Sequence, residues 1–364
     1  MEPFNAGWLS LLPPAAAIVA ALISREVISA LLVGIFTGAV IYTSSTGGGV
    51  IIGSLDAVFS MMVSTLEFKI LIFTSLLGAV VYLVSLSGGS KAYGEWAGRR
   101  MKTKRKSLLS ACGLGCLVFI DDYFSCLFVG TVMKPLTDRC RVARAKLAWI
   151  VDSTAAPVCI IAPVSSWAAA VAASLKSTPL EDQSMAAFMA AIPWNFYAIL
   201  TIALVVYLIW RGRDFGPMLT AQAEAEKAEN LRQDEEQTEP TGNGGLLEMI
   251  FPIALLLIFS FAALLYSGGF WSDGPTKYQF GAAIGASSSS SALCWAGFGT
   301  LVATMLLYVP RGVLSFTKCM DGAVNGMKLM LPANIILVLA WTLSGICRDL
   351  LMSAQYVDCL LYTS

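Results

Sequence analysis

Residues 107–133 read SLLSACGLGCLVFIDDYFSCLFVGTVM, an apolar stretch that carries two adjacent acids, Asp121 and Asp122, near its middle. The connections on either side of it are basic. Residues 88–106 hold seven lysines and arginines against one acid, and residues 134–146 hold five against one. Lysine and arginine are concentrated in the cytoplasmic connections of membrane proteins, so we expect both connections on the cytoplasmic side.

A single crossing by residues 107–133 would separate the two basic connections, whereas two crossings need about 40 residues. The stretch therefore predicts a re-entrant helical hairpin that enters from the cytoplasm and turns inside the membrane near Asp121 and Asp122. Backbone that is not helical is tolerated at that depth only where protein or a water-filled cavity surrounds it.

The whole chain has the composition of a membrane protein. Its 364 residues are 57% hydrophobic and 13% charged, with a mean hydropathy of +0.71. Globular proteins are about 25% charged. About 9–10 hydrophobic segments follow one another, several of them close to the length of a membrane-crossing helix. The sequence predicts an all-α polytopic membrane protein with a re-entrant hairpin, broken helices and an incomplete inverted repeat.

Three features of the residue content exclude other functions. The chain has no histidine, which excludes imidazole bases, Ser-His-Asp triads and histidine-bound zinc. Its 24 basic and 24 acidic residues leave no net charge to attract nucleic acid. The nine cysteines form no C-x-x-C pair, so they are predicted to be buried apolar residues.

Three parts are expected along the chain. Residues 1–210 form a first transmembrane repeat, with the hairpin at 107–133 and a broken helix at 145–175 that unwinds near residues 152–157 because Pro157 and Pro163 each remove a backbone donor. Residues 211–245 hold eight acids and four bases and are expected to be a solvated cytoplasmic linker, helical in part. Residues 246–364 form a partial second repeat.

Five residues make up the candidate ion site. Asp121 and Asp122 would lie where a charge costs at least a few kcal/mol, and intramembrane acids are rare and usually functional. Asp152, Ser153 and Thr154 add a carboxylate and two hydroxyls, hard oxygen donors that suit Na⁺. The alternatives are an exposed loop for the acid pair and a polar helix-packing patch for residues 152–154.

Four motifs resemble the NhaC-type Na⁺/H⁺ antiporter family of the ion-transporter superfamily: FIDDYF at 119–124, MKPLTDR at 133–139, ARAKLA at 143–148 and DSTAAPV at 152–158. The stretches GWLSLLPP at 7–14 and LVLAWTL at 337–343 are also similar. The resemblance implies an inverted-repeat transporter that exchanges Na⁺ for H⁺, whereas some members exchange organic anions such as malate and lactate. It further implies that family members continue beyond Ser364 with a second hairpin, so that this chain is C-terminally truncated.

Four functions stay open on the sequence. Na⁺/H⁺ antiport at membrane-embedded aspartates is the first, and antiport of malate- or lactate-type anions coupled to Na⁺ or H⁺ is the second. A remote third is an intramembrane aspartyl protease, since Asp152-Ser153-Thr154 lacks the glycine that follows in the soluble protease signature. The fourth is a membrane scaffold, in which these acids could be replaced without loss of function.

An antiporter is not an enzyme and is expected to need no cofactor. Its expected partners are membrane lipid, sodium ions and protons, and not nucleic acid. A homodimer is left open as an assembly state. The expected location is the inner (plasma) membrane, crossed several times.

Overall fold

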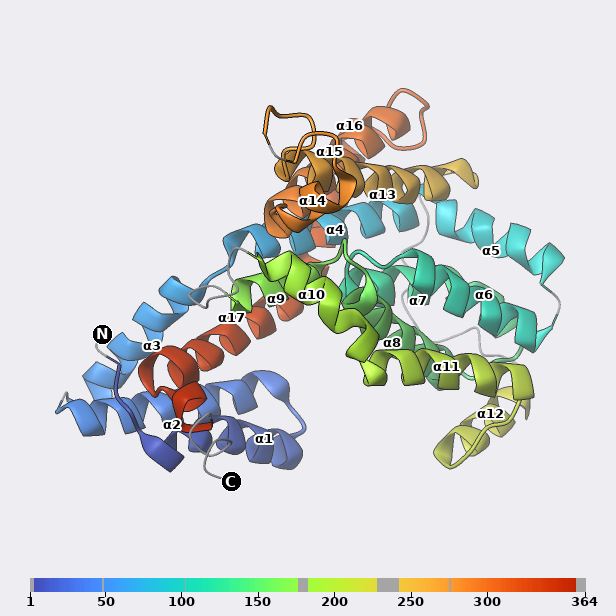
Figure 1. Ribbon diagram of the computed structural model, residues 1–364. Helices are drawn as coiled ribbons and strands as arrows, with labels where there is room; N and C mark the ends of the chain where they lie inside the picture. The colour runs from blue at the N-terminus through green and yellow to red at the C-terminus, as the bar shows by residue number, and fades with distance from the viewer. Residues whose placement is uncertain are drawn as a thin grey trace. The chain divides into compact units, whose positions relative to one another are not determined.

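The computed structural model describes residues 3–47, 49–101, 103–175, 183–227, 242–274 and 276–357, and these residues form helices and connections without a β-strand (Figure 1). The chain divides into two compact units. Unit 1 consists of Met1–Phe68 and Met330–Ser364, and unit 2 consists of Lys69–Leu329.

Both units are built from helices connected by short turns. Those of unit 1 are η1 (Gly7–Leu11), α1 (Leu12–Ser24), α2 (Val27–Thr46), α3 (Val50–Thr65), α17 (Leu331–Gly345) and the π-helix η4 (Ile346–Leu350). Those of unit 2 begin with α4 (Phe68–Ser87), whose first residue belongs to unit 1. They continue with α5 (Gly89–Arg100), α6 (Lys104–Leu117), α7 (Asp122–Arg139), α8 (Arg144–Ile161), α9 (Ser166–Ser174), α10 (Ser184–Ala191), η3 (Ile192–Trp194), α11 (Phe196–Arg211), α12 (Pro217–Lys227), α13 (Leu247–Ser267), α14 (Phe280–Gly285), α15 (Ser289–Tyr308) and α16 (Phe316–Leu329).

The predicted all-α polytopic membrane fold is confirmed. Among the described residues, six helical segments are long and apolar enough to cross a membrane: Gly7–Ser24, Val27–Thr46, Phe68–Ser87, Leu247–Ser267, Ser289–Tyr308 and Leu331–Leu350. A seventh candidate is the pair Ser184–Trp194 and Phe196–Arg211, which is bent by 48°. Charged residues are scarce in these segments because a helix surrounded by lipid satisfies its backbone internally and exposes apolar side chains.

In unit 1, helices α1 and α2 form an antiparallel pair. Arg25 ends α1 in the left-handed conformation, with φ 56°, and the Glu26 carboxylate caps α2 by accepting from the backbone N–H of Ile28 and of Ser29, the latter at 2.6 Å. The helices approach closely at Gly34, where an added Cβ would lie 2.8 Å from the Ala17 side chain. Small residues allow this approach, which stabilises helix pairs in lipid through packing.

In unit 2, helices α6 and α7 run in opposite directions on either side of residues 118–121. The Cys140 sulfur, just after α7, lies 3.8 Å from the backbone oxygen of Met101, just before α6. The start of α6 and the end of α7 therefore lie together, with the turn at the other end. The membrane depth of this turn stays a prediction.

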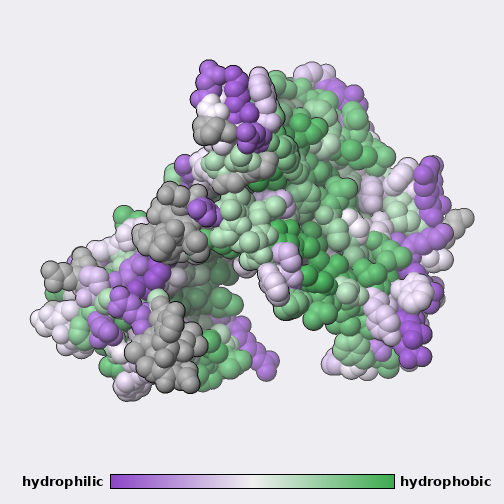
Figure 2. All heavy atoms as spheres, in the orientation of Figure 1, coloured by the Kyte–Doolittle hydropathy of each residue, from purple (hydrophilic) through white to green (hydrophobic). Residues whose placement is uncertain are grey.

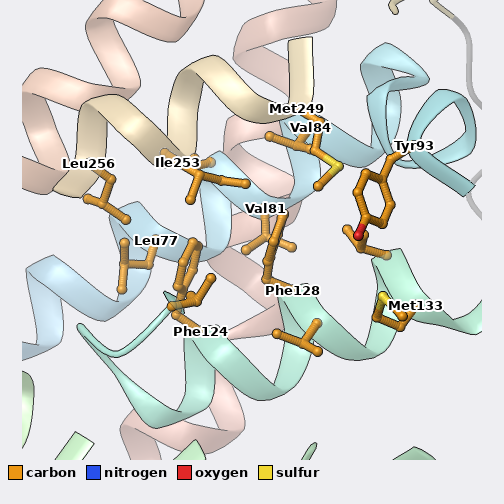
Figure 3. Packing of buried hydrophobic residues seen from close by; sticks show 14 of the residues in the cluster. Leu77, Val81, Val84, Tyr93, Phe124, Phe128, Met133, Met249, Ile253 and Leu256 are labelled. Atoms are coloured by element: carbon orange, nitrogen blue, oxygen red, sulfur yellow. The ribbon is translucent and has the colours of Figure 1, made fainter. Parts of the chain in front are cut away.

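The core of unit 2 lies between α4, α7 and α13. Figure 3 shows Phe124 and Phe128 of α7 facing Leu77 and Val81 of α4, with Ile253 of α13 beside them. The two phenylalanine rings stack with their centroids 5.7 Å apart. This packing holds one side of the hairpin and so determines the position of its turn.

The broken helix of residues 145–175 is interrupted at 162–165, between α8 and α9. The expected unwinding near residues 152–157 was wrong, because these residues lie inside α8. A helix tolerates Pro157 by leaving a single backbone carbonyl without its usual donor. At Pro163 the chain also leaves the helix because the residue before a proline is disfavoured in the helical conformation, and Ala162 is extended, with ψ 124°.

Part of the acidic linker is helical and contacts the open end of the hairpin. Gln222 of α12 donates to the backbone oxygen of Arg141 at 2.9 Å and accepts from the backbone N–H of Ala143 at 3.1 Å. Lys104 at the start of α6 pairs with Glu226, and Lys146 pairs with Asp214 at 2.6 Å. The Lys104 ammonium and the Gln222 amide lower the pKa of Glu226. Residues 228–241 of the linker lie outside the described residues.

We expect Gln222→Leu to loosen α12 from the turn between α7 and α8. The variant loses both backbone contacts, and each hydrogen bond contributes about 1 kcal/mol, so amide hydrogen exchange in residues 141–146 should accelerate about 30-fold. Hydrogen–deuterium exchange measured by mass spectrometry checks this. The matched control is Thr220→Val, since Thr220 donates only to Pro217 of its own helix, at 2.7 Å. Equal rates of amide hydrogen exchange in the two variants would show that Gln222 does not hold α12 against residues 141–143.

Candidate ion site at the hairpin turn

The hairpin turn is built around the buried Asp121 side chain. Helix α6 ends at Leu117, and α7 begins at Asp122 with Asp121 as its extended N-cap residue, φ −150° and ψ 138°. The Asp121 carboxylate accepts from the backbone N–H of Phe124 at 2.8 Å, and the residue is 3% exposed. Aspartate is a favoured N-cap because its carboxylate pairs with free N–H groups of the first turn. Asp121 is therefore the last residue of the connection after α6 and caps the start of α7.

The break between α8 and α9 lies directly against this turn. The backbone N–H of Ser166 donates to the oxygen of Ile120 at 2.7 Å. The Ser165 hydroxyl donates to the backbone oxygen of Cys159 at 2.7 Å and accepts from the N–H of Ala168, so it closes the break on both sides. Two interruptions of helical structure, about 45 residues apart in sequence, therefore satisfy each other's backbone groups.

Two helix N-termini converge on the acid pair. Asp121 precedes α7, and the Ser166 hydroxyl, in the first turn of α9, lies close enough to the Asp121 carboxylate to interact with it. The Trp167 side chain lies close enough to Asp122 to interact with its carboxylate. Because the N-terminus of a helix carries a partial positive charge, this arrangement stabilises carboxylates in the turn.

Asp122 and Asp152 are the two acids that remain accessible. Asp122 is half-buried and Asp152 is exposed on α8. The two carboxylates are close enough to interact electrostatically, and the Cys126 thiol, one turn after Asp122, interacts with both of them and with Asp121. Among the described residues, no three Asp, Glu or Cys side chains are close enough to hold a metal ion together. An ion here would draw on one or two carboxylates and on hydroxyl, carbonyl or water oxygens.

The two hydroxyl residues next to Asp152 differ in their surroundings. Thr154 is fully buried, and its hydroxyl donates within α8 to the backbone oxygens of Ile150 at 2.8 Å and Val151 at 3.2 Å. It packs against Gly115 of α6, where an added Cβ would lie 2.7 Å from the Thr154 hydroxyl oxygen. Ser153 is half-buried. Thr154 therefore supports the contact between α6 and α8, while Ser153 stays available beside Asp152.

Sequence reasoning did not assign Ser166 or Trp167 to the site. The signal was present, since Pro163, Ser165 and Ser166 follow one another in an apolar run. The sequence predicted the break near residues 152–157, so it did not reveal that residues just after 162–165 would meet the hairpin turn.

Comparison with known proteins gives the family. Residues 158–363 match the model of the Na⁺/H⁺ antiporter family. This chain belongs to the Na⁺/H⁺ antiporter family. An uncharacterized protein of Haemophilus influenzae is 32% identical over 370 residues, which cover 98% of this chain and 70% of that protein. No solved structure matches this antiporter-family chain.

In this member of the Na⁺/H⁺ antiporter family, the region matched by the family model includes the break after α8, Ser166 and Trp167. The family is a transporter family, so the chain is assigned to cation/proton antiport in a membrane that it crosses several times.

Proposed function

We propose that this chain carries out NhaC-type exchange of Na⁺ for H⁺, with Asp122 and Asp152 as the carboxylates that bind the two cations in turn. Asp121, with Ser166, holds the hairpin turn in place. The observation that carries the proposal is the meeting of the two helix breaks at Ile120 and Ser166, which places the acid pair between two helix N-termini.

Sodium and protons compete for the same oxygens. Na⁺ is a hard cation that prefers carboxylate, hydroxyl, carbonyl and water oxygens, and Asp122, Asp152 and Ser153 offer the first two kinds. A proton on either carboxylate removes the charge that attracts Na⁺. Bound Na⁺ in turn favours loss of the proton, because an opposite charge nearby favours the ionised form. Na⁺ is exchanged for H⁺ if the site can turn from one side of the membrane to the other only while it holds one of these cations.

The basic connections give the orientation. Lys104 and Lys146 lie at the open end of the hairpin with α12, and this end is assigned to the cytoplasm. The hairpin would then enter the membrane from the cytoplasmic side of the inner membrane, and cytoplasmic cations would reach Asp122 and Asp152 from there.

The test is Na⁺-driven proton movement in proteoliposomes that contain the full chain and a trapped pH-sensitive dye. NaCl added outside should raise the internal pH, because each sodium ion that enters displaces protons outward, whereas choline chloride at equal ionic strength should not. Absence of a Na⁺-dependent change with folded, monodisperse protein would overturn the proposal. Malate or lactate added with and without Na⁺ tests the organic-anion alternative in the same vesicles.

A further inference from the structure

Helix α5 joins the cytoplasmic ends of two other elements of unit 2. At its start, an added Cβ on Gly89 would lie 2.9 Å from the backbone nitrogen of Met249, in the first turn of α13. Just after its end, Met101 contacts Cys140 at the open end of the hairpin. Figure 1 shows α5 between α13 and α6. Helix α5 is about 18 Å long, too short to cross the membrane, and its last turn lies at the open end of the hairpin.

One face of α5 packs on the hairpin. The Tyr93 hydroxyl lies 3.5 Å from the Ser110 hydroxyl of α6, and an added Cβ on Gly94 would lie 3.2 Å from the Pro135 side chain of α7. Ala97, one turn further along, is fully buried. This face fixes which side chains of α5 point away from the protein.

The opposite face combines cations with an aromatic ring. Lys91, Arg99 and Arg100 are exposed, and Trp96 is 39% exposed. The Arg100 guanidinium lies over the Trp96 ring, 5.2 Å from its centroid, and Tyr93 packs against the same ring. Figure 2 shows hydrophilic residues gathered at the edge of the molecule where α5 and α12 lie.

Some cations of unit 2 pair with carboxylates of the chain, and others do not. Lys104, Lys146 and Arg311 each pair with a carboxylate of the chain. Among the described residues, no carboxylate pairs with Lys91, Arg99 or Arg100, although Glu95 lies on the same helix. These exposed cations are therefore free to bind an anion from outside unit 2.

We infer that the outer face of α5 binds the phosphate groups of anionic phospholipids in the cytoplasmic leaflet. Tryptophan is favoured at the headgroup level, where its ring meets the acyl chains and its N–H meets water. Clusters of lysine and arginine beside membrane helices attract anionic headgroups, and an arginine guanidinium can donate two parallel hydrogen bonds to one phosphate. Trp96 holds the Arg100 guanidinium at this level and so positions it for a lipid phosphate.

Lipid retention by the purified full chain tests this inference. The detergent-solubilised protein is incubated with phosphatidylglycerol or phosphatidylcholine, and bound lipid is counted by native mass spectrometry. We expect the wild type to prefer phosphatidylglycerol and R99Q/R100Q to lose about fivefold in affinity for each arginine removed. The matched control is R213Q/K318Q, which removes the same charge from exposed positions outside α5 and should keep the preference.

Two results with the variants would overturn the inference. One is equal phosphatidylglycerol binding by R99Q/R100Q and the wild type, and the other is an equal loss in both double variants, which would indicate net charge rather than a site. Excess inorganic phosphate should fail to displace the lipid, because it lacks the acyl chains that contact Trp96, and displacement would count against a lipid site. Circular dichroism and gel filtration establish that the variants are folded before binding is compared.

Discussion

Asp122→Asn is expected to lower Na⁺-driven proton movement in proteoliposomes about 100-fold. The amide of asparagine cannot release a proton and carries no charge to hold Na⁺, and a charge-assisted contact contributes about 1.5–3 kcal/mol. The fold should survive, because Asp122 is only half-buried and asparagine has nearly the same shape. The measurement is the initial rate of internal pH change after addition of NaCl.

Three further variants make this result specific to the site. Asp122→Glu keeps the charge and should retain part of the rate, while Asp152→Asn should raise the Na⁺ concentration needed for half the maximal rate. Asp56→Asn removes an exposed acid from α3, far along the chain from the hairpin, and should leave the rate unchanged. A rate in Asp122→Asn above half that of the wild type would remove this carboxylate from the exchange step.

Glu248→Ala is expected to give the largest loss of stability among the substitutions considered. Glu248, at the start of α13, is 2% exposed. Its carboxylate accepts from the backbone N–H of Gly245 at 2.7 Å and from the Arg311 guanidinium at 2.9 and 3.1 Å. Alanine removes one backbone hydrogen bond and one charge-assisted hydrogen bond, at a cost of about 2–3 kcal/mol. The thermal midpoint, followed by tryptophan fluorescence in detergent, should fall by about 4–12 °C.

Two other substitutions serve as comparisons for Glu248→Ala. Arg311→Gln leaves the buried Glu248 carboxylate without its cation, but the glutamine amide can still donate a hydrogen bond to it, so this variant should also lower the midpoint, by a smaller amount. Glu95→Ala removes an exposed carboxylate from α5 and should leave the midpoint within about 1 °C. If Glu248→Ala and Glu95→Ala melt together, the buried carboxylate does not stabilise the junction between α13 and the end of α15.

Several predictions from the sequence depended on local patterns and agree with the structure. Apolar length and scarce charge predicted membrane-crossing helices, and among the described residues six helical segments are long and apolar enough to cross. The predicted helical part of the linker is α12. The prediction of where the helix breaks was wrong, since Pro157 lies within α8 and the chain leaves the helix only after Ile161. Proline shows where a helix is weakened, whereas neighbouring segments decide where it opens.

The sequence alone determined the membrane environment, the basic connections and the rarity of Asp121, Asp122 and Asp152 in apolar surroundings, because hydropathy and charge are properties of individual residues summed over short windows. Only the tertiary structure decided that Ser166 would meet Ile120, that Thr154 would pack on Gly115 and that Asp121 would be buried while Asp152 stayed exposed. These outcomes depend on which backbone groups lack a partner and which surfaces fit closely once distant segments meet. Neither property can be read from one segment by itself.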